Sequence, residues 1–300
     1  MIANEDSCFT SQEVIPDSSS LSTSKSKGVI PKQAFEGYYS PVPDRHAAEY
    51  NMNHKKRGMA IIFNHKNFDE RMGQDTRHGT DVDVANLERV LQQLHFDVIQ
   101  YKDLCHNEIV RVVKRAASEN HENNDCILIA ILSHGIKGYI FANDGMYKLA
   151  DICDFFTPNN CPTLAGKPKL FFVQACQGDQ MDGGVTMKVQ TDGSSDVSYK
   201  IPLHADFLIA YSTLPGFYSW RNQKKGSWFI QSLCLELESN GKHLDLMTLL
   251  TFVCRRVAVK FESNTDNPDM HQKKQIPCIT TMLTRTVLFN DKPMNNSKCF

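Results

Sequence analysis

The sequence carries almost no excess charge of either sign. Its 300 residues include 33 basic and 34 acidic side chains, which leaves a formal net charge of -1. Strong electrostatic attraction to nucleic acid or to an anionic membrane is therefore not expected. With 41% hydrophobic and 22% charged residues, the composition is typical of a soluble globular protein that can bury one large core or two smaller ones.

Long hydrophobic runs are also missing. The longest uninterrupted apolar run, 126–132, is far shorter than the roughly 20 residues of a membrane-spanning helix. The first 17 residues contain Glu5, Asp6 and Glu13 but no basic start and no apolar core, so they do not form a secretory signal. We therefore expect a cytoplasmic protein with neither nucleic acid nor a membrane as a partner.

Cysteine and histidine spacings typical of structural zinc are absent. The ten cysteines and eleven histidines include no Cys-x-x-Cys and no His-x-x-x-His pair, so we predict no metal and no cofactor. The cysteines are dispersed among apolar neighbours, as in Leu233-Cys234-Leu235. This pattern indicates buried thiols in a reducing compartment rather than disulfides.

The chain begins with a segment that has little regular pattern. Six serines occur between Ser18 and Ser26, and helical or strand periodicity starts only near residue 57. We interpret 1–45 as a flexible tail, too short for a separate folded module.

From Gly58 onward, expected strands and helices alternate, and no internal repeat is present. We predict strands at 59–63, 96–101, 126–132, 169–173, 207–211, 278–283 and 287–289, and helices near 84–94, 109–116, 149–156, 227–238 and 244–261. The interval 177–200, rich in glycine and aspartate, is expected to be a long exposed loop. Continuously apolar central strands predict an α/β fold with a mostly parallel central sheet of about six strands and helices on both faces.

Two expected strands end in residues with reactive side chains. One runs into Ser-His-Gly at 133–135 and the other into Gln-Ala-Cys-Gln-Gly at 174–178. Neighbouring parallel strands that end at one edge could bring Cys176 and His134 within hydrogen-bond reach, which a nucleophilic thiol needs. For an isolated pair, a buried structural thiol and a hydrogen-bonded core histidine would be the more frequent interpretation.

The surrounding motifs resemble the caspase family. The pentapeptide 174–178 fits the caspase pattern, with a histidine some tens of residues upstream. Further matching segments, in the family's order and spacing, are 77–83 (RHGTDVD), 133–135 (SHG), 211–213 (YST), 218–222 (YSWRN), 226–228 (GSW) and 273–278 (KKQIPC). The resemblance covers about 45 to 290 and is closest to insect executioner caspases. It implies a caspase-like three-layer fold and an endopeptidase that cleaves proteins after aspartate in apoptosis.

The resemblance also assigns catalytic roles. Cys176 would attack the peptide carbonyl, His134 would transfer protons, and the backbone amides of Gly135 and Cys176 would hold the oxyanion. Glycine at 135 leaves room for close approach. The sequence shows no evident Asn or Asp to orient the imidazole, so we expect a backbone carbonyl near Asp75 to do so.

Recognition of aspartate requires cationic donors for a short buried carboxylate, and the planar fork of arginine suits this better than lysine. The resemblance places Arg77, Gln174 and Arg221 in this primary pocket. Two isolated arginines would more often be solvated loop residues; their positions inside matching motifs favour the pocket.

Aromatic residues follow in the same region. Tyr218 and Trp220 would line the pocket for the residue that precedes the aspartate, and Asn222 and Trp228 would shape the pocket for the fourth residue back. Ser219 is included among the expected substrate-binding residues. The alternative for such an aromatic cluster is ordinary core packing.

A zymogen that is activated by cleavage is a further implication. We expect the cut after Asp192, with Asp196 as the alternative, and an N-terminal trim after Asp17, with Asp44 competing. An Asp-Gly pair such as 192–193 is most often only a turn. The expected regions are a flexible tail or propeptide over 1–45, a large-subunit region over 46–192 and a small-subunit region over 193–300, with one caspase domain over 46–290.

The implied partners are protein substrates with exposed Asp-containing loops, an upstream activating protease and inhibitor proteins. A homodimer of large and small subunit pairs is expected through the strand at 278–283, which would cover a sheet edge. Two alternatives remain at this point: a catalytically silent relative that binds partners, and a redox-sensing thiol with a resolving cysteine nearby.

Overall fold

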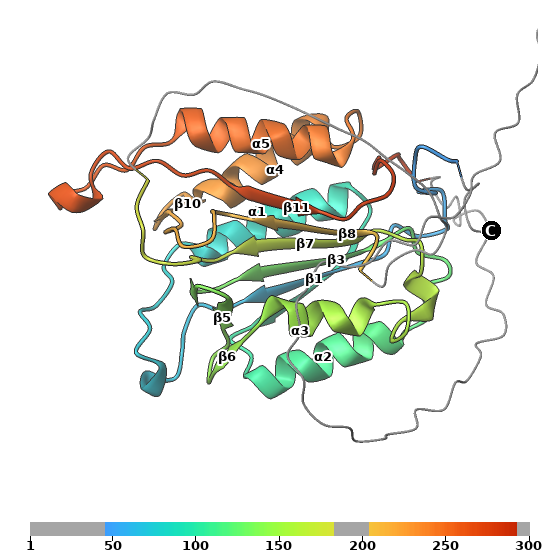
Figure 1. Ribbon diagram of the computed structural model, residues 1–300, viewed down its shortest axis with the longest axis horizontal. Helices are drawn as coiled ribbons and strands as arrows, with labels where there is room; N and C mark the ends of the chain where they lie inside the picture. Colours follow the sequence, from blue (N-terminus) through green and yellow to red (C-terminus); the bar gives the residue numbers. More distant parts are fainter. Residues whose placement is uncertain (1–45, 183–203, 293–300) are drawn as a thin grey trace, which may run out of the picture. The chain divides into compact units, whose positions relative to one another are not determined.

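A six-stranded sheet forms the centre of the part of the chain that the structure describes (Figure 1). The computed structural model describes residues 46–182 and 204–292. The strands of this sheet are β1 (Met59–Asn64), β2 (Asp97–Lys102), β3 (Ile127–Leu132), β7 (Lys169–Gln174), β8 (Phe207–Tyr211) and β11 (Cys278–Thr281). Their order is β11-β8-β7-β3-β1-β2, and only β11 is antiparallel to its neighbour. The predicted mostly parallel sheet is confirmed.

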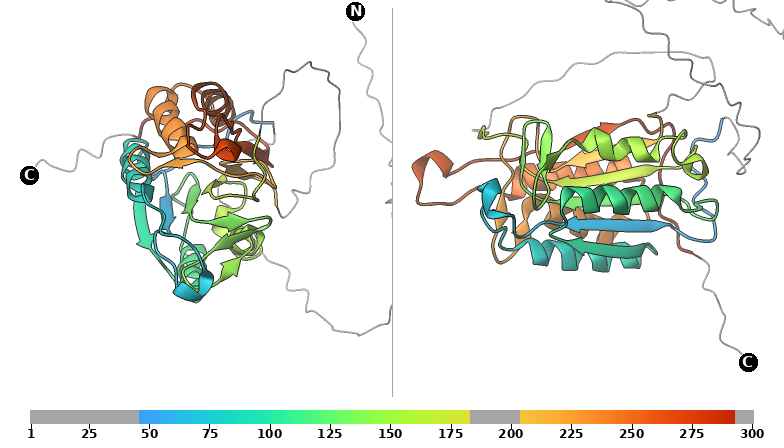
Figure 2. Two further views of the ribbon diagram at one scale, coloured as in Figure 1. Left: turned by 90° about the vertical axis from the view of Figure 1, so that its left-hand side faces the viewer. Right: turned by 90° about the horizontal axis from the view of Figure 1, so that it is seen from below.

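Helices cover both faces of this sheet (Figures 1 and 2). They are α1 (Thr80–Gln93), α2 (His106–Ser118), α3 (Leu149–Cys153), α4 (Trp228–Asn240) and α5 (Leu246–Lys260). Successive strand residues point to opposite faces. Ile62 of β1 therefore packs in the cluster that contains Leu87 of α1, and Ile61 packs in the cluster that contains Val113 of α2. The predicted three-layer arrangement is confirmed.

The register of the central strands brings their carboxyl ends to one edge. Asn64 of β1 lies beside Leu132 of β3, and Leu132 lies beside Gln174 of β7. All residues of these three strands are buried, because most of their side chains are apolar and helices cover both faces of the sheet. The residues that follow the strands therefore start from one level, where reactive groups of such sheets collect.

Several short elements were not predicted. They are the three-stranded antiparallel sheet of β4 (Gly135–Ile136), β5 (Tyr139–Phe141) and β6 (Met146–Tyr147), the hairpin of β9 (Arg221–Asn222) and β10 (Gly226–Ser227), and the 3-10 helices η1 (Glu70–Met72), η3 (Pro162–Leu164) and η4 (Pro268–Met270). The helix predicted near 149–156 is divided into α3 and the 3-10 helix η2 (Asp154–Phe156). Elements of two or three residues are too short to show a hydrophobic period.

The predicted strand at 287–289 is wrong. The structure assigns no strand there, and the nearby pairing is a single bridge between Glu49 and Thr286. Val287 and Phe289 are nevertheless buried, and the Phe289 ring contacts that of Phe96 at 5.8 Å. The alternating pattern therefore reflects burial of alternate side chains against the core and no strand pairing.

The expected exposed loop at 177–200 is tied down at its start. Gln180 forms a bridge with Phe217, and Asp182 forms one with Lys274. The rest of that loop, with the expected cuts after Asp192 and Asp196 and the subunit boundary between them, lies outside the described residues. So does the expected tail over 1–45 with Asp17 and Asp44.

Two further properties of the described residues concern their cysteines and their helices. Each of their cysteines is a free thiol. None of the described helices is both long enough and apolar enough to cross a membrane.

Candidate active site

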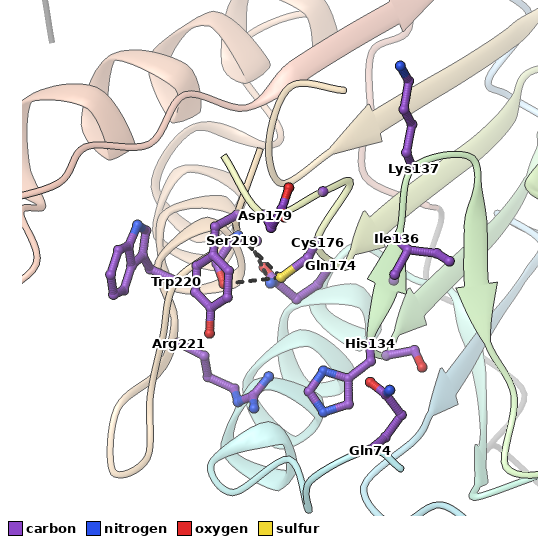
Figure 3. A pocket seen from close by; sticks show the side chains of 14 residues that line it. Gln74, His134, Ile136, Lys137, Gln174, Cys176, Asp179, Ser219, Trp220 and Arg221 are labelled. Atoms are coloured by element: carbon purple, nitrogen blue, oxygen red, sulfur yellow. Dashed lines mark hydrogen bonds between the residues drawn. The ribbon is translucent and has the colours of Figure 1, made fainter. Parts of the chain in front are cut away.

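A cavity of about 590 Å³ lies at the carboxyl ends of β3 and β7 (Figure 3). Most of the residues that the sequence analysis assigns to the site line this cavity: His134, Gly135, Gln174, Cys176, Tyr218, Ser219, Trp220 and Arg221. The three others, Arg77, Asn222 and Trp228, do not line it. The structure thus brings the candidate thiol and imidazole to one cavity, together with one of the two candidate arginines.

The Cys176 thiol is held by the chain segment that faces β7. The backbone N–H of Ser219 donates to Sγ at 3.4 Å, and the thiol lies 3.8 Å from the Ser219 carbonyl oxygen (Figure 3). Burial raises the pKa of Cys176, while the hydrogen bond from Ser219 and the positive charges of Arg77 and Arg221 oppose this rise. The resting group is therefore a neutral thiol that needs a base.

The imidazole of His134 is oriented by a backbone carbonyl. Its Nε2 lies 2.9 Å from the carbonyl oxygen of Asp75, which can only accept a hydrogen bond. Nε2 therefore carries the proton, and Nδ1 keeps a free lone pair. The ring also packs against Phe68, with the ring centres 5.2 Å apart.

Burial lowers the pKa of His134 to about 4; the hydrogen bond to Asp75 opposes this, and the charges of Arg77 and Arg221 add to it. The imidazole is neutral at neutral pH and able to accept a proton.

Gly135 lies against the backbone of the nucleophile segment. A Cβ at this position would lie 2.4 Å from the carbonyl oxygen of Cys176 and 3.1 Å from the Cβ of Ala175. No side chain fits in this space. The expected need for glycine thus has a direct geometric cause, because the backbones that follow β3 and β7 approach each other here.

Arg77 is fully buried behind the cavity. Its Nη1 donates to the carbonyl oxygen of His65 at 2.9 Å and to Oγ1 of Thr80 at 2.8 Å. Its Nε and Nη2 are buried and have no hydrogen-bond partner among the described residues. Burial lowers the pKa of Arg77 to about 9, helped by the charge of Arg221, so the group remains cationic at neutral pH. Unpaired buried guanidinium donors are costly, and an incoming anion would satisfy them.

Gln174 and Arg221 also present polar groups to the cavity. Gln174 donates from Nε2 to Oγ of Ser219 at 2.8 Å, and its buried Oε1 has no partner in the described part of the chain. Arg221 lies on β9 and donates from Nε to the carbonyl oxygen of His78 at 2.9 Å. Figure 3 shows its guanidinium group directed toward the side of the cavity on which His134 lies.

The aromatic residues form one continuous stack that starts at the cavity. Ring centres are 5.1 Å apart for Tyr218 and Trp220, 5.6 Å for Trp220 and Trp228, and 5.4 Å for Trp228 and Phe261. Only the first two line the cavity. Trp228 supports Trp220 from behind, so cavity lining and core packing both occur within this cluster.

Asn222 ends β9 and is followed by the turn of the β9–β10 hairpin. Its Oδ1 accepts hydrogen bonds from the backbone N–H groups of Lys224 and Lys225 at 2.9 and 3.0 Å. These contacts fix the turn, and they explain why an asparagine inside a matching motif does not line the cavity.

Two supporting residues were missed. Gln275 accepts from the backbone N–H of Trp220 at 2.7 Å and donates to the carbonyl oxygen of Ser212 at 2.7 Å. Asp83 is buried and accepts two hydrogen bonds from Ser227. Both lie in the matching segments 273–278 and 77–83, so the resemblance marked their positions without indicating their contacts.

The described residues contain no group of three or more His, Cys, Asp or Glu side chains arranged to hold a metal ion.

Known proteins resemble the chain over most of its length. Residues 57–288 match the family model of the caspase domain. The chain is 63% identical over 277 residues to caspase drICE of Drosophila melanogaster, which covers 87% of this chain and 81% of that protein. It is 44% identical over 268 residues to caspase-7 of Gallus gallus, with 86% and 85% covered. The crystal structure of caspase-1 from Spodoptera frugiperda matches with a TM-score of 0.78 at 52% identity, covering 84% of this chain and 98% of that one.

Proposed function

The chain belongs to the caspase family and is a cysteine endopeptidase that cleaves proteins after aspartate in apoptosis, and we propose that Cys176 is its nucleophile and His134 its proton-transfer residue. One observation carries this proposal. The thiol and a neutral imidazole with a free Nδ1 line the same cavity, and Nε and Nη2 of the nearby Arg77 have no hydrogen-bond partner in the described part of the chain.

The resting protonation states define the proposed first step. The thiol proton moves to Nδ1 of His134 as Sγ of Cys176 bonds to the substrate carbonyl carbon, and the carbonyl electron pair moves to oxygen. The imidazolium then gives its proton to the leaving amine while the C–N bond breaks. A water molecule attacks the carbonyl carbon of the resulting thioester and loses a proton to His134. The C–S bond then breaks, the carboxylic acid product leaves, and His134 returns the proton to the sulfur. The Asp75 carbonyl keeps the ring oriented throughout.

The backbone amides of Gly135 and Cys176 are the proposed oxyanion donors. The close contact between the two backbone segments supports this, because it leaves no space for a side chain beside the reacting carbonyl. Such donors act in a site shielded from water, where each is worth roughly a factor of 10² to 10³ in rate.

The substrate aspartate is proposed to bind Arg77, Arg221 and Gln174. The two unpaired donors of Arg77 and its remaining positive charge support this assignment, since a carboxylate matches the fork of a guanidinium group. Access to Arg77 from the cavity would run past Arg221 and Gln174, which line it.

Tyr218, Ser219 and Trp220 are proposed to contact the residues before the aspartate, since all three line the cavity. Trp228 and Asn222 would then act indirectly on the more distal pocket, the first through its stacking on Trp220 and the second through the hairpin turn.

Cys176→Ala tests the central assignment. It should abolish hydrolysis of peptides that carry aspartate at the cut, because no other thiol lines the cavity among the described residues. Cys105→Ala is the matched control, since this half-exposed cysteine lies before α2 and outside the cavity, and it should retain full activity. Hydrolysis by Cys176→Ala at the wild-type rate would exclude Cys176 as the nucleophile.

Maturation is proposed to follow a cut after Asp192, with Asp196 as the alternative, which divides 46–192 from 193–300. Site residues come from both sides of this point, and the parallel pairing of β7 with β8 would hold the two parts together. Intact-mass analysis of the mature protein tests this: a C-terminal fragment that starts at neither Gly193 nor Val197 excludes both sites. The same spectrum decides between N-terminal trims after Asp17 and Asp44.

Family membership implies protein substrates and a dimeric arrangement. We further propose that the dimer forms through the chain around β11, that an upstream protease activates the zymogen, that inhibitor proteins occupy the same cavity and that the protein is cytoplasmic. The free thiols of the described residues are consistent with a reducing compartment.

A further inference from the structure

The two arginines proposed to bind the substrate aspartate come from distant parts of the chain. Arg77 precedes α1, and Arg221 lies on β9, on the other side of the proposed maturation cut. Their relative position is therefore a tertiary property. It depends on whatever joins the start of α1 to the β9–β10 hairpin.

Asp83 makes that connection. It lies in the first turn of α1 with 1% of its surface exposed. Its Oδ1 accepts from the backbone N–H of Ser227 at 2.8 Å, and its Oδ2 accepts from Oγ of Ser227 at 2.5 Å. Ser227 is paired with Arg221 in the hairpin ladder. The carboxylate thus holds the residue directly opposite Arg221.

Two glycines allow the hairpin to come this close. Gly226 has φ +88°, and a Cβ on it would lie 2.2 Å from Oδ1 of Asp83. Gly79 has φ +85°, and a Cβ on it would lie 2.6 Å from the carbonyl oxygen of Asn222. Both positions therefore exclude a side chain on steric and on conformational grounds. The hairpin is docked onto the segment that follows Arg77 at two separate points.

The hydrogen bonds of Asp83 also determine what its charge does. Its negative charge favours the protonated forms of Arg77 and Arg221. Both carboxylate oxygens are nevertheless occupied by Ser227, and Nε and Nη2 of Arg77 remain without a partner among the described residues. The carboxylate therefore balances part of the positive charge without taking the donors that a substrate carboxylate needs.

We propose that Asp83 is a positioning residue for aspartate recognition, which fixes Arg221 relative to Arg77 through its two hydrogen bonds to Ser227. This inference rests on the proposed role of the two arginines. The Asp83 carboxylate does not line the cavity. Through its effect on Arg221 it nevertheless contributes to the selectivity for aspartate over longer acidic side chains at the cut.

Asp83→Ala and Asp83→Asn together test the proposal. Alanine removes both hydrogen bonds, so KM for a peptide cut after aspartate should rise about tenfold or more, with kcat changed less than about threefold. The preference for aspartate over glutamate in kcat/KM should fall by a similar factor. Asparagine can accept from the Ser227 N–H and donate to its Oγ, so this variant should stay within about threefold of wild type in KM and in preference.

Asp245→Ala is the matched control. Asp245 caps the N-terminus of α5 by accepting from the backbone N–H groups of Met247 and Thr248 and does not line the cavity. Its loss should lower thermal stability and leave KM and the aspartate preference unchanged. An Asp83→Ala enzyme with the same behaviour as this control overturns the proposal, as does an Asp83→Asn enzyme as impaired as Asp83→Ala.

If Asp83→Ala does not fold, Ser227→Ala tests the positioning role of Asp83 instead. It removes only the Oγ bond, so KM should rise about threefold, and an unchanged KM overturns the proposal. The rate of Cys176 alkylation by iodoacetamide, which needs no aspartate pocket, should match wild type in every folded variant. Failure of the proposed function itself would be visible separately, as Cys176-independent cleavage or no cleavage after aspartate by the wild-type enzyme.

Discussion

At the scale of single residues, Gly135 allows two backbone segments of the proposed active site to approach each other closely. In Gly135→Ala, a Cβ placed 2.4 Å from the Cys176 carbonyl oxygen would force the two backbones apart. We expect kcat to fall by about 10² to 10³, the typical effect of losing one oxyanion donor. Steady-state kinetics on an aspartate peptide measures this.

The control for this change is Gly145→Ala, because no atom lies within 4 Å of a Cβ built on Gly145. It should retain activity within about twofold, since surface substitutions of this kind have small effects. Equal activity of the two variants would show that the contact between Gly135 and Cys176 is not needed for turnover.

Arg77→Lys keeps the charge and removes the planar fork. Lysine cannot bind His65 and Thr80 and still offer two further donors, so KM for aspartate peptides should rise at least about tenfold. Arg111→Lys, on the exposed surface of α2, is the control and should leave KM unchanged. A wild-type KM in Arg77→Lys would mean that charge alone suffices for recognition.

The sequence pointed to the residues that we propose to react and missed those that support them. Cys176 and His134 follow long apolar strands, so their positions could be predicted from strand ends alone. Asp83 and Ser227 are 144 positions apart, and no local pattern shows that they are hydrogen-bonded. Arg77 lies between these cases, because its motif predicted a role but could not predict that it is buried behind the cavity.

At the scale of elements, the length of a strand decides whether it can be predicted from the sequence. Strands such as β3 have enough buried residues to display a pattern, whereas β4, β9 and β10 have two residues each. These short strands exist because tertiary contacts hold them, as the docking of the β9–β10 hairpin on Gly79 illustrates. The error at 287–289 has the converse cause, since alternate burial occurred there without a partner strand.

β11 is the edge strand through which we expect dimerisation. Met282 donates to the Phe207 carbonyl and accepts from Asp206, so by strand alternation the N–H of Thr281 points away from β8. Thr281→Pro removes this outward donor and should yield single large and small subunit pairs in sedimentation, because the paired edge would lose a hydrogen bond and gain a steric clash. Thr281→Val keeps the N–H and should remain dimeric. A dimeric proline variant would place the interface elsewhere.

At the scale of the whole molecule, buried ionisable groups link stability to pH. His65 is 1% exposed, and neither ring nitrogen has a partner among the described residues. Burial lowers the pKa of His65 to about 4, and the charge of Arg77 adds to this. The unfolded chain therefore binds this proton more readily than the folded protein between about pH 6.5 and 4, so folding stability is lost as the pH falls through that window.

Other ionisable groups near the site also contribute to the pH dependence of folding stability. The pKa of His134 is lowered in the same direction. Burial raises the pKa of Asp83 to about 6, and this group favours the folded state as the pH falls through the range from about 6 to its unfolded value near 4. Two histidines act against one carboxyl group, so net stability should decrease on acidification over this range.

The variant His65→Asn tests the contribution of His65 to the pH dependence of folding stability. Asparagine does not titrate, so the variant should lose less stability than wild type between pH 7 and pH 5, by up to about 2 kcal/mol, which is the linkage expected for one proton over this interval. Urea unfolding at the two pH values measures the difference, and comparing each protein with itself cancels the packing change that the substitution introduces. An unchanged loss would mean that the His65 ring gains a partner or water in solution that lets it charge without unfolding. In that case Arg77, whose Nη1 is bonded to the His65 carbonyl, would face a second cation in mildly acidic solution, and aspartate binding would weaken before the fold does.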